Sequence, residues 1–171
     1  VLADFPVVLV DKKMEGIAVA SVRTNGEEAM QQLVHYLAER GRKQIALVTV
    51  EEVGTSTLIE RRAGFYQGME AEGLIPCPEC RLPYLNYENT FQVYGEVYRE
   101  QIRQYLKAWR GSLNGIVCAE YGVAMEVTAA LKELDCGDAI EVCCIDENYI
   151  GPGQYRLTHV KQDEKKMAGC A

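Results

Sequence analysis

Short apolar runs alternate with longer stretches of helical periodicity along this chain, and that alternation constrains the fold more than any other feature. The run QIALVTV has the length of a buried strand, whereas GEEAMQQLVHYLAER repeats apolar residues at i, i+4, i+7 and i+8. Strands that alternate with helices of this length are joined by right-handed crossovers. The sequence therefore predicts an α/β fold with a parallel sheet and helices on both of its faces.

The apolar runs and turn signals set the bounds of the expected elements. The first strand, 6–10, is expected to be short and buried, and Asn25 is expected to cap the first helix. The expected strands cover 6–10, 44–50, 81–85, 115–119, 140–145 and 157–160. The expected helices cover 25–40, 57–72, 91–109 and 122–134, and a final helix begins within 163–170.

Composition excludes two classes of partner. The formal net charge of −7 argues against a nucleic-acid surface on this segment, which would carry a basic stripe. No apolar run approaches the roughly 20 residues that span a bilayer, so no membrane contact is expected. A length of 171 residues suits one domain, or somewhat more than half of a two-lobed protein.

The seven cysteines are odd in number and irregularly spaced. Cys118, Cys143 and Cys144 fall inside apolar runs, where a free thiol behaves as a small hydrophobic side chain. This usage favours a reducing cytosol over a disulfide framework. Cys77 and Cys80 form a CxxC motif, but no second pair of metal ligands stands at a matching spacing, so we expect an incidental loop.

Signatures of catalysis and of nucleotide binding are missing from the sequence. There is no GxGxxG after the early strand, no GxxxxGK[ST] and no GxSxG elbow. His35 lies in the middle of a predicted helix and His159 in a short strand, and each is interpreted as a packed or half-exposed residue. We therefore expect no enzyme activity, no metal and no cofactor.

Lone polar residues follow several of the predicted strands. Arg61, Glu120, Asp146 and Gln162 come shortly after QIALVTV, NGIVCA, IEVCCI and LTHV. In an open parallel sheet, ligands bind beyond the carboxyl ends of the strands. The pattern predicts one ligand-binding cleft, without distinguishing a binding protein from an enzyme.

Six segments in order make a resemblance specific: FPVVLVDK, TNGEEAMQQLVHYLAERGRKQIALVT, IERRAGFYQGMEAEG, NGIVCAEYGVAMEVTAALKEL, IEVCCIDE and LTHVKQD. Together they resemble the sugar-binding effector domain of LacI/GalR-family transcription regulators. They also resemble the related domain attached to GntR-type DNA-binding heads, as in the arabinose repressor. The resemblance covers nearly the whole chain and implies a type I periplasmic-binding-protein-like lobe with flavodoxin-like strand order.

The resemblance carries ligand-binding roles onto matching residues. The family's E-R-x-x-G-F pattern is matched from Glu60 to Phe65, and its arginine, here Arg61, would hydrogen-bond ligand hydroxyls. Asp146 matches the acid at the end of the V-G-[FY]-D-D strand and would accept from two hydroxyls. Gln162 closes the L-T-T-[VI]-x-Q segment and would donate and accept near the hinge.

One position departs from the family pattern. Glu120 and Tyr121 stand where the family usually has Asn-Asp, and an ionised glutamate only accepts. Either the ligand is polyhydroxylated or cationic, or Glu120 turns away, because carboxylates at Glu120 and Asp146 would repel each other. Further candidates for the rim of the site are the aromatic residues Tyr87 and Phe91 and the polar residues Thr57 and Asn25.

The resemblance also implies a domain organisation. Residues 1–171 would be the C-terminal lobe of the effector-binding domain, with crossover segments at about 1–12 and 155–171. The first lobe and the DNA-binding head would be absent from this chain. The implied protein is a cytoplasmic homodimer that binds a small-molecule effector, most typically a sugar. It would contact operator DNA through the DNA-binding head, which is not in this chain.

Two other classes remain open from the sequence. A periplasmic sugar-binding protein of an uptake system shares the fold, but it would be exported, and seven thiols argue against export. An α/β enzyme would need a phosphate-binding loop or a catalytic base at a strand end.

Overall fold

A five-stranded parallel sheet forms the centre of the molecule. The computed structural model describes residues 6–14, 16, 18–53, 56–85, 91–146 and 157–171. The sheet has the order β4-β3-β5-β6-β7, and every neighbouring pair is parallel. Ranked along the chain this order is 2-1-3-4-5, which confirms the flavodoxin-like order. Its strands are β3 (Ile45–Val50), β4 (Cys80–Leu82), β5 (Gly115–Cys118), β6 (Glu141–Ile145) and β7 (Thr158–Val160).

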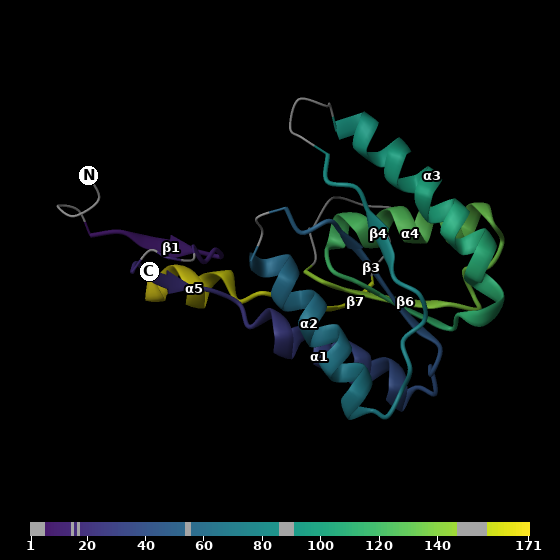
Figure 1. Cartoon of the computed structure of the whole chain (residues 1–171), viewed down its shortest axis with the longest axis horizontal. Helices are drawn as coiled ribbons and strands as arrows, with labels where there is room; N and C mark the ends of the chain where they lie inside the picture. Colours follow the sequence, from purple (N-terminus) through teal and green to yellow (C-terminus); the bar gives the residue numbers. More distant parts are fainter. Residues whose placement is uncertain (1–5, 15, 17, 54–55, 86–90, 147–156) are drawn as a thin grey trace.

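Helices cover both faces of this sheet, as the alternating pattern predicts (Figure 1). Side chains of β3 alternate between two cores: Ile45 and Leu47 pack with α1 and α2, whereas Ala46 and Val48 pack with α3 and α4. This period of two is what a strand buried on both sides requires. The helices are α1 (Gly26–Glu39), α2 (Ser56–Ala71), α3 (Phe91–Trp109), α4 (Tyr121–Glu133) and α5 (Glu164–Cys170), with a 3₁₀ turn at Arg110–Ser112.

The beginning of the described chain differs from the prediction. The strand expected to be buried at 6–10 is β1 (Val8–Val10), which pairs with β2 (Ala20–Val22) in a separate parallel ribbon. Val8 is 38% exposed and Val10 is 52% exposed, so the prediction of burial is wrong. The strand β2 was not predicted from the sequence, because its residues are mostly exposed and form no long apolar run. In Figure 1, β1 lies apart from the main sheet, near α5.

The edge strand β4 is shorter than expected. The sequence predicts a strand over 81–85, but β4 ends at Leu82, directly before Pro83. Proline cannot donate to a ladder and is confined to strand ends and sheet edges. The paired part of the segment is therefore limited to the three residues that precede it.

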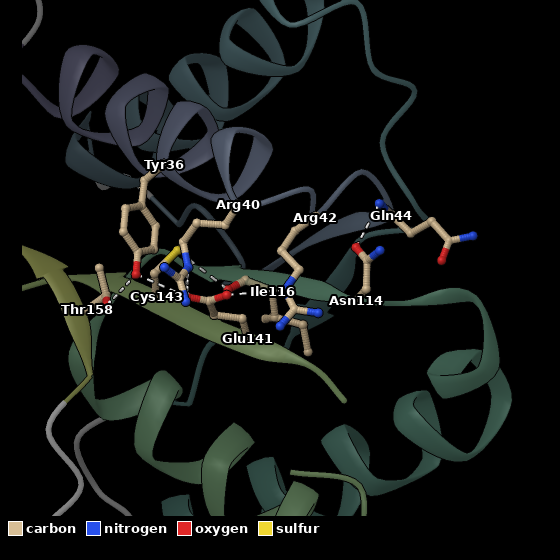
Figure 2. Close-up of polar contacts among 9 residues, drawn as sticks. All are labelled: Tyr36, Arg40, Arg42, Gln44, Asn114, Ile116, Glu141, Cys143 and Thr158. Carbon is tan, nitrogen blue, oxygen red and sulfur yellow. Dashed lines mark hydrogen bonds and ion pairs between the residues drawn. The ribbon is translucent and has the colours of Figure 1, made fainter. Parts of the chain in front are cut away.

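A polar network anchors the amino end of the sheet (Figure 2). The carboxylate of Glu141, the first residue of β6, accepts hydrogen bonds from the Tyr36 hydroxyl at 3.0 Å, from Arg40 Nε at 2.7 Å and from Arg42 Nε at 3.2 Å. Burial disfavours its charge, but the hydrogen bonds from Arg42 and Tyr36 outweigh burial and lower the pKa of Glu141. This network ties the end of α1 to the start of β6, at the edge of the sheet opposite the carboxyl ends of its strands.

Two smaller expectations are settled by side-chain contacts. Asn25 caps α1, since its Oδ1 accepts from the backbone N of Glu28 at 3.2 Å. His35, expected to be packed or half-exposed, is instead exposed, so that prediction is wrong; its Nδ1 lies 2.7 Å from Glu72 Oε1. Within the part of the chain that the structure describes, no helix combines the length and apolar character needed to cross a membrane.

Candidate functional site

The polar residues predicted to gather at the carboxyl ends of the strands fall into two linked groups. The sheet reverses its direction of growth at β3, because β4 lies on one side of that strand and β5 on the other. Such a reversal opens a crevice beyond the carboxyl ends of the two central strands. Arg61 and Glu120 lie at the carboxyl end of β5, and Asp146 and Gln162 lie at the end of the neighbouring strand β6.

Arg61 is held in place by the strand end that it faces. Its side chain is only 7% exposed, and its Nη1 donates to the carbonyl oxygen of Ala119, directly after β5, at 2.9 Å. The start of α1 leaves room for its stem, because a Cβ on Gly26 would lie 3.3 Å from Arg61 Cγ. The bond to Ala119 uses one of the five N–H groups that a guanidinium carries.

Glu120 lies beside Arg61, at the N-cap position of α4. Its side chain makes no capping hydrogen bond to the helix. Burial raises the pKa of Glu120, and the nearby positive charge of Arg61 opposes this rise. A carboxyl group in these surroundings gains from a ligand that donates hydrogen bonds to it.

Asp146 and Gln162 are brought into direct contact. Asp146 follows β6 with a φ of +67°, a left-handed conformation that an aspartate tolerates better than most residues. Its Oδ1 accepts from the backbone N of Gln162 at 3.2 Å, and its Oδ2 accepts from Gln162 Nε2. The other end of the Gln162 amide accepts from Thr24 Oγ1 at 2.6 Å.

Asp11 joins these two groups, and the sequence analysis did not select it. Burial raises the pKa of Asp11, the charge of Arg61 opposes the rise, and the charge of Asp146 adds to it. Its Oδ1 is buried without a hydrogen-bond partner among the described residues. Asp11 follows β1 just as Asp146 follows β6, so the rule that identified Asp146 could also have found it.

An ion pair borders the cluster. Arg23, after β2, contacts Glu60, the neighbour of Arg61 on α2. A hollow of about 390 Å³ extends from this pair along the start of α1; its lining residues include Ser21, Thr24, Asn25 and Glu27. A larger hollow of about 550 Å³ lies at the other end of the sheet, around the α4–β6 connection, away from every predicted site residue.

The structure describes only part of the remaining candidate residues. Thr57 lies half-buried in the first turn of α2, four residues before Arg61 and therefore on the same side of the helix. Tyr87 lies outside the described residues. Phe91 is the first residue of α3, and its side chain is likewise outside the described part. The roles of all three in binding stay predictions.

The CxxC motif carries no assembled site. Cys77 lies in the connection before β4, Cys80 begins that strand, and both thiols are free. Burial raises the pKa of Cys80 to about 12, so its thiol stays protonated. Among the residues that the structure describes, no group of three or more His, Cys, Asp or Glu side chains could hold a metal ion.

The fold is shared with solved transcription regulators. One similar structure is a sugar-binding transcriptional regulator of the LacI family from Escherichia coli, in complex with phosphate (TM-score 0.76, 19% identity, 96% of this chain and 57% of that one). A PurR family regulator from Vibrio parahaemolyticus gives a TM-score of 0.74 at 19% identity and covers 95% and 59%. A dimeric Lac repressor with a C-terminal deletion gives 0.76 at 20% identity and covers 98% and 59%.

The chain thus spans less than two thirds of the length of these structures. No curated protein matches it by sequence. The family model of the periplasmic binding protein-like domain matches residues 34–171, a range that contains Arg61, Glu120, Asp146 and Gln162. The chain therefore belongs to the periplasmic binding protein-like domain family.

Proposed function

We propose that this chain forms the effector-binding part of a bacterial transcription regulator of the LacI/GalR type, with a sugar or sugar derivative as its effector. The observation that carries the proposal is the gathering of Arg61, Glu120, Asp146 and Asp11 around the carboxyl ends of the strands. The similar structures named above, which are described as LacI or PurR family regulators, support the regulatory role.

The chemistry of the cluster suits a ligand rich in hydroxyl groups. Carboxylates accept hydrogen bonds from hydroxyls, and a planar guanidinium donates to two adjacent oxygens. Arg23 is already paired with Glu60, so Asp11 and Glu120 face the charge of Arg61, and the carboxylate of Asp146 lies near that of Asp11. This excess of acceptors favours a neutral polyol or an amino sugar over an anionic ligand.

The proposal includes a domain organisation. The chain corresponds to one lobe, the C-terminal one, together with connecting segments at about 1–12 and 155–171. Its match to 57–59% of the similar structures, at almost full coverage of its own length, supports this correspondence. A second lobe forms the opposite wall of the cleft, and a separate head contacts DNA.

The mechanism follows from two lobes around one site. An effector that binds the closed arrangement better than the open one shifts the population toward closure. In a homodimer, closure changes the relative position of the two DNA-binding heads and hence the affinity for operator DNA. Such a protein acts in the cytoplasm, where the free thiols remain reduced.

A thermal-shift screen of the intact protein tests the proposal, with pentoses, hexoses, sugar phosphates, amino sugars and purines as the panel. A ligand present at 100 times its Kd adds about 2.7 kcal/mol to the free energy of unfolding and raises Tm. We expect a sugar or amino sugar to raise Tm, and Arg61→Lys and Asp146→Asn to abolish the shift. Asp138→Asn, an exposed change beside the larger hollow, is the matched control.

Three results would contradict the proposal. No panel member raises Tm, or a shift survives both Arg61→Lys and Asp146→Asn, or the bound sugar is chemically converted. Binding of a sugar without any effect on DNA affinity, in a mobility-shift assay with the DNA upstream of the gene, would instead favour an uptake binding protein.

A further inference from the structure

We propose that Gln162 is a positioning residue: its side-chain amide joins the segment after β2 to Asp146, and does not itself contact the effector. The inference rests on the proposed function only for the role of Asp146 as the acid that binds the effector. The bonding pattern itself is a property of the chain without any ligand.

Both ends of the Gln162 amide are engaged within the protein. Oε1 accepts from the hydroxyl of Thr24 at 2.6 Å, and Nε2 donates to Asp146 Oδ2. The orientation of the amide is fixed by these partners, because a carboxylate can only accept whereas a hydroxyl can donate. Each end of the Gln162 amide is thus bonded within the protein, which fixes the amide between Thr24 and Asp146.

Gln162 also fixes the orientation of the Asp146 carboxylate. The backbone N of Gln162 donates to Asp146 Oδ1 at 3.2 Å, so each oxygen of Asp146 bonds to a different group of Gln162. The backbone of Asp146 is anchored as well, since its N donates to the Val160 carbonyl at 2.9 Å. A carboxylate held at both oxygens has one orientation, which a site for a small ligand requires.

The bridge reaches the other connecting segments. Thr24 follows β2, and its hydroxyl also lies 3.5 Å from the sulfur of Met167 in α5. The backbone N of Asp11, after β1, donates to the Val22 carbonyl at 2.9 Å. The segment after β2 and helix α5 are therefore linked to Asp146 through Thr24 and Gln162, and the segment after β1 is joined to them through Val22. A ligand that binds Asp146 would affect the position of these segments through the same hydrogen bonds.

A double-mutant cycle on the full chain tests the bridge without a ligand. The variants are Thr24→Val, Gln162→Leu and the pair, and the readout is the protection factor of the backbone amide of residue 162 in NMR-detected hydrogen exchange. Each single change is expected to lower protection by roughly 3- to 10-fold, as for the loss of one net hydrogen bond. The pair is expected to lower it no further than Gln162→Leu alone, because both changes break one network.

Two control variants separate positioning from a general loss of stability. Thr24→Ser keeps the hydroxyl and is expected to restore wild-type protection. Thr128→Val removes a hydroxyl that bonds the Ala124 carbonyl within α4 and is expected to leave residue 162 unchanged. Additive losses in the pair, or failure of Thr24→Ser to restore protection, would overturn the proposal.

Calorimetric titration of the intact protein with D-ribose and D-galactose tests whether the bridge affects effector binding. Thr24→Val is expected to weaken the affinity for whichever of these sugars binds by the same factor as Gln162→Leu. A weakened affinity in Gln162→Leu alone would make Gln162 a direct contact and overturn the inference. If neither sugar binds, the exchange cycle still decides the bridge, and only the proposed effector class loses support.

Discussion

At the scale of single residues, Gly64 shows how closely two helices approach. A Cβ at Gly64 would lie 2.3 Å from the carbonyl oxygen of Glu27 and 2.5 Å from its Cα, and neither backbone atom can move aside cheaply. We predict that Gly64→Ala lowers the free energy of unfolding by at least ~2 kcal/mol in urea titration, because α1 and α2 must separate. Gly122→Ala, where a Cβ meets nothing within 4 Å, should be neutral or slightly stabilising.

A neutral or stabilising effect in both variants would show that helix propensity, not the close approach, governs position 64. The approach also bears on the site, because Arg61 leaves α2 one turn before Gly64 and passes the start of α1. A displaced α2 would carry Arg61 away from the Ala119 carbonyl. Gly64→Ala is therefore expected to weaken ligand binding as well as stability.

The sequence predicts a site residue when it comes shortly after an apolar run that forms a strand of the main sheet, and it gives no signal for site residues in other positions. Arg61, Glu120 and Asp146 all lie at the cluster, because parallel strands bring their carboxyl ends together. Asp11 was missed because its strand was treated as an element of the core and not as part of an exposed ribbon. The engagement of Gln162 with Thr24 spans 138 positions, and no local pattern encodes such a pairing.

At the scale of elements, the junction of α1 with β6 depends on one carboxylate. Glu141 accepts from Tyr36, Arg40 and Arg42, and its side chain is only 17% exposed. We predict that Glu141→Gln lowers the free energy of unfolding by about 1–3 kcal/mol, because the charge-assisted bonds weaken and one of the two acceptor oxygens is replaced by a donor. Glu133→Gln, which breaks an exposed pair with Arg103, should cost less than about 1 kcal/mol.

The pH dependence of the Glu141 effect has a definite sign. The pKa of Glu141 is lowered from its ordinary 4.5, so its contribution is fully present above that pH and is lost as the pH falls through the lowered value. The difference between wild type and Glu141→Gln should therefore be constant from about pH 6 to 8 and shrink below about pH 4.5. A difference that grows on acidification would exclude this explanation.

The sequence predicts the strands that are covered by helices on both faces, and it does not predict the strand β2 of the exposed ribbon. The central strands β3, β5 and β6 read as apolar runs because helices cover both of their faces. The ribbon of β1 and β2 has no such cover, and so its second strand left no apolar run in the sequence. The end of β4 before Pro83 follows from the sequence itself, because proline lacks the N–H that a strand pairing needs.

At the scale of the whole molecule, the strand order was implied by the family resemblance and not by the periodicity. Alternating elements fix a parallel sheet with crossovers, but they are compatible with several orders of strands. The free thiols follow from the same fold. Cys118 and Cys144 are register partners in β5 and β6, and both are buried in the apolar interior of the sheet, where a thiol packs as a small hydrophobic side chain.

Thiol reactivity therefore measures opening of the sheet. Burial raises the pKa of Cys118 and of Cys143 well above the ordinary value, and only a thiolate reacts with a disulfide reagent. We predict that Cys170, which is exposed, reacts first with DTNB at pH 8, and that Cys118, Cys143 and Cys144 react only at the rate of unfolding. Cys170→Ser should remove the fast phase and leave the slow phase unchanged.

The slow phase gives the stability of the sheet as a unit. If β5 and β6 open only with the whole sheet, Cys118 in β5 and Cys143 in β6 react together, and urea accelerates both with the slope of global unfolding. Fast reaction of Cys143 alone would mean that β6 separates from β5 in the native state. The acid at its end, Asp146, would then sit on a mobile strand, and neither the ligand site nor its bridge to Thr24 could be held in one arrangement.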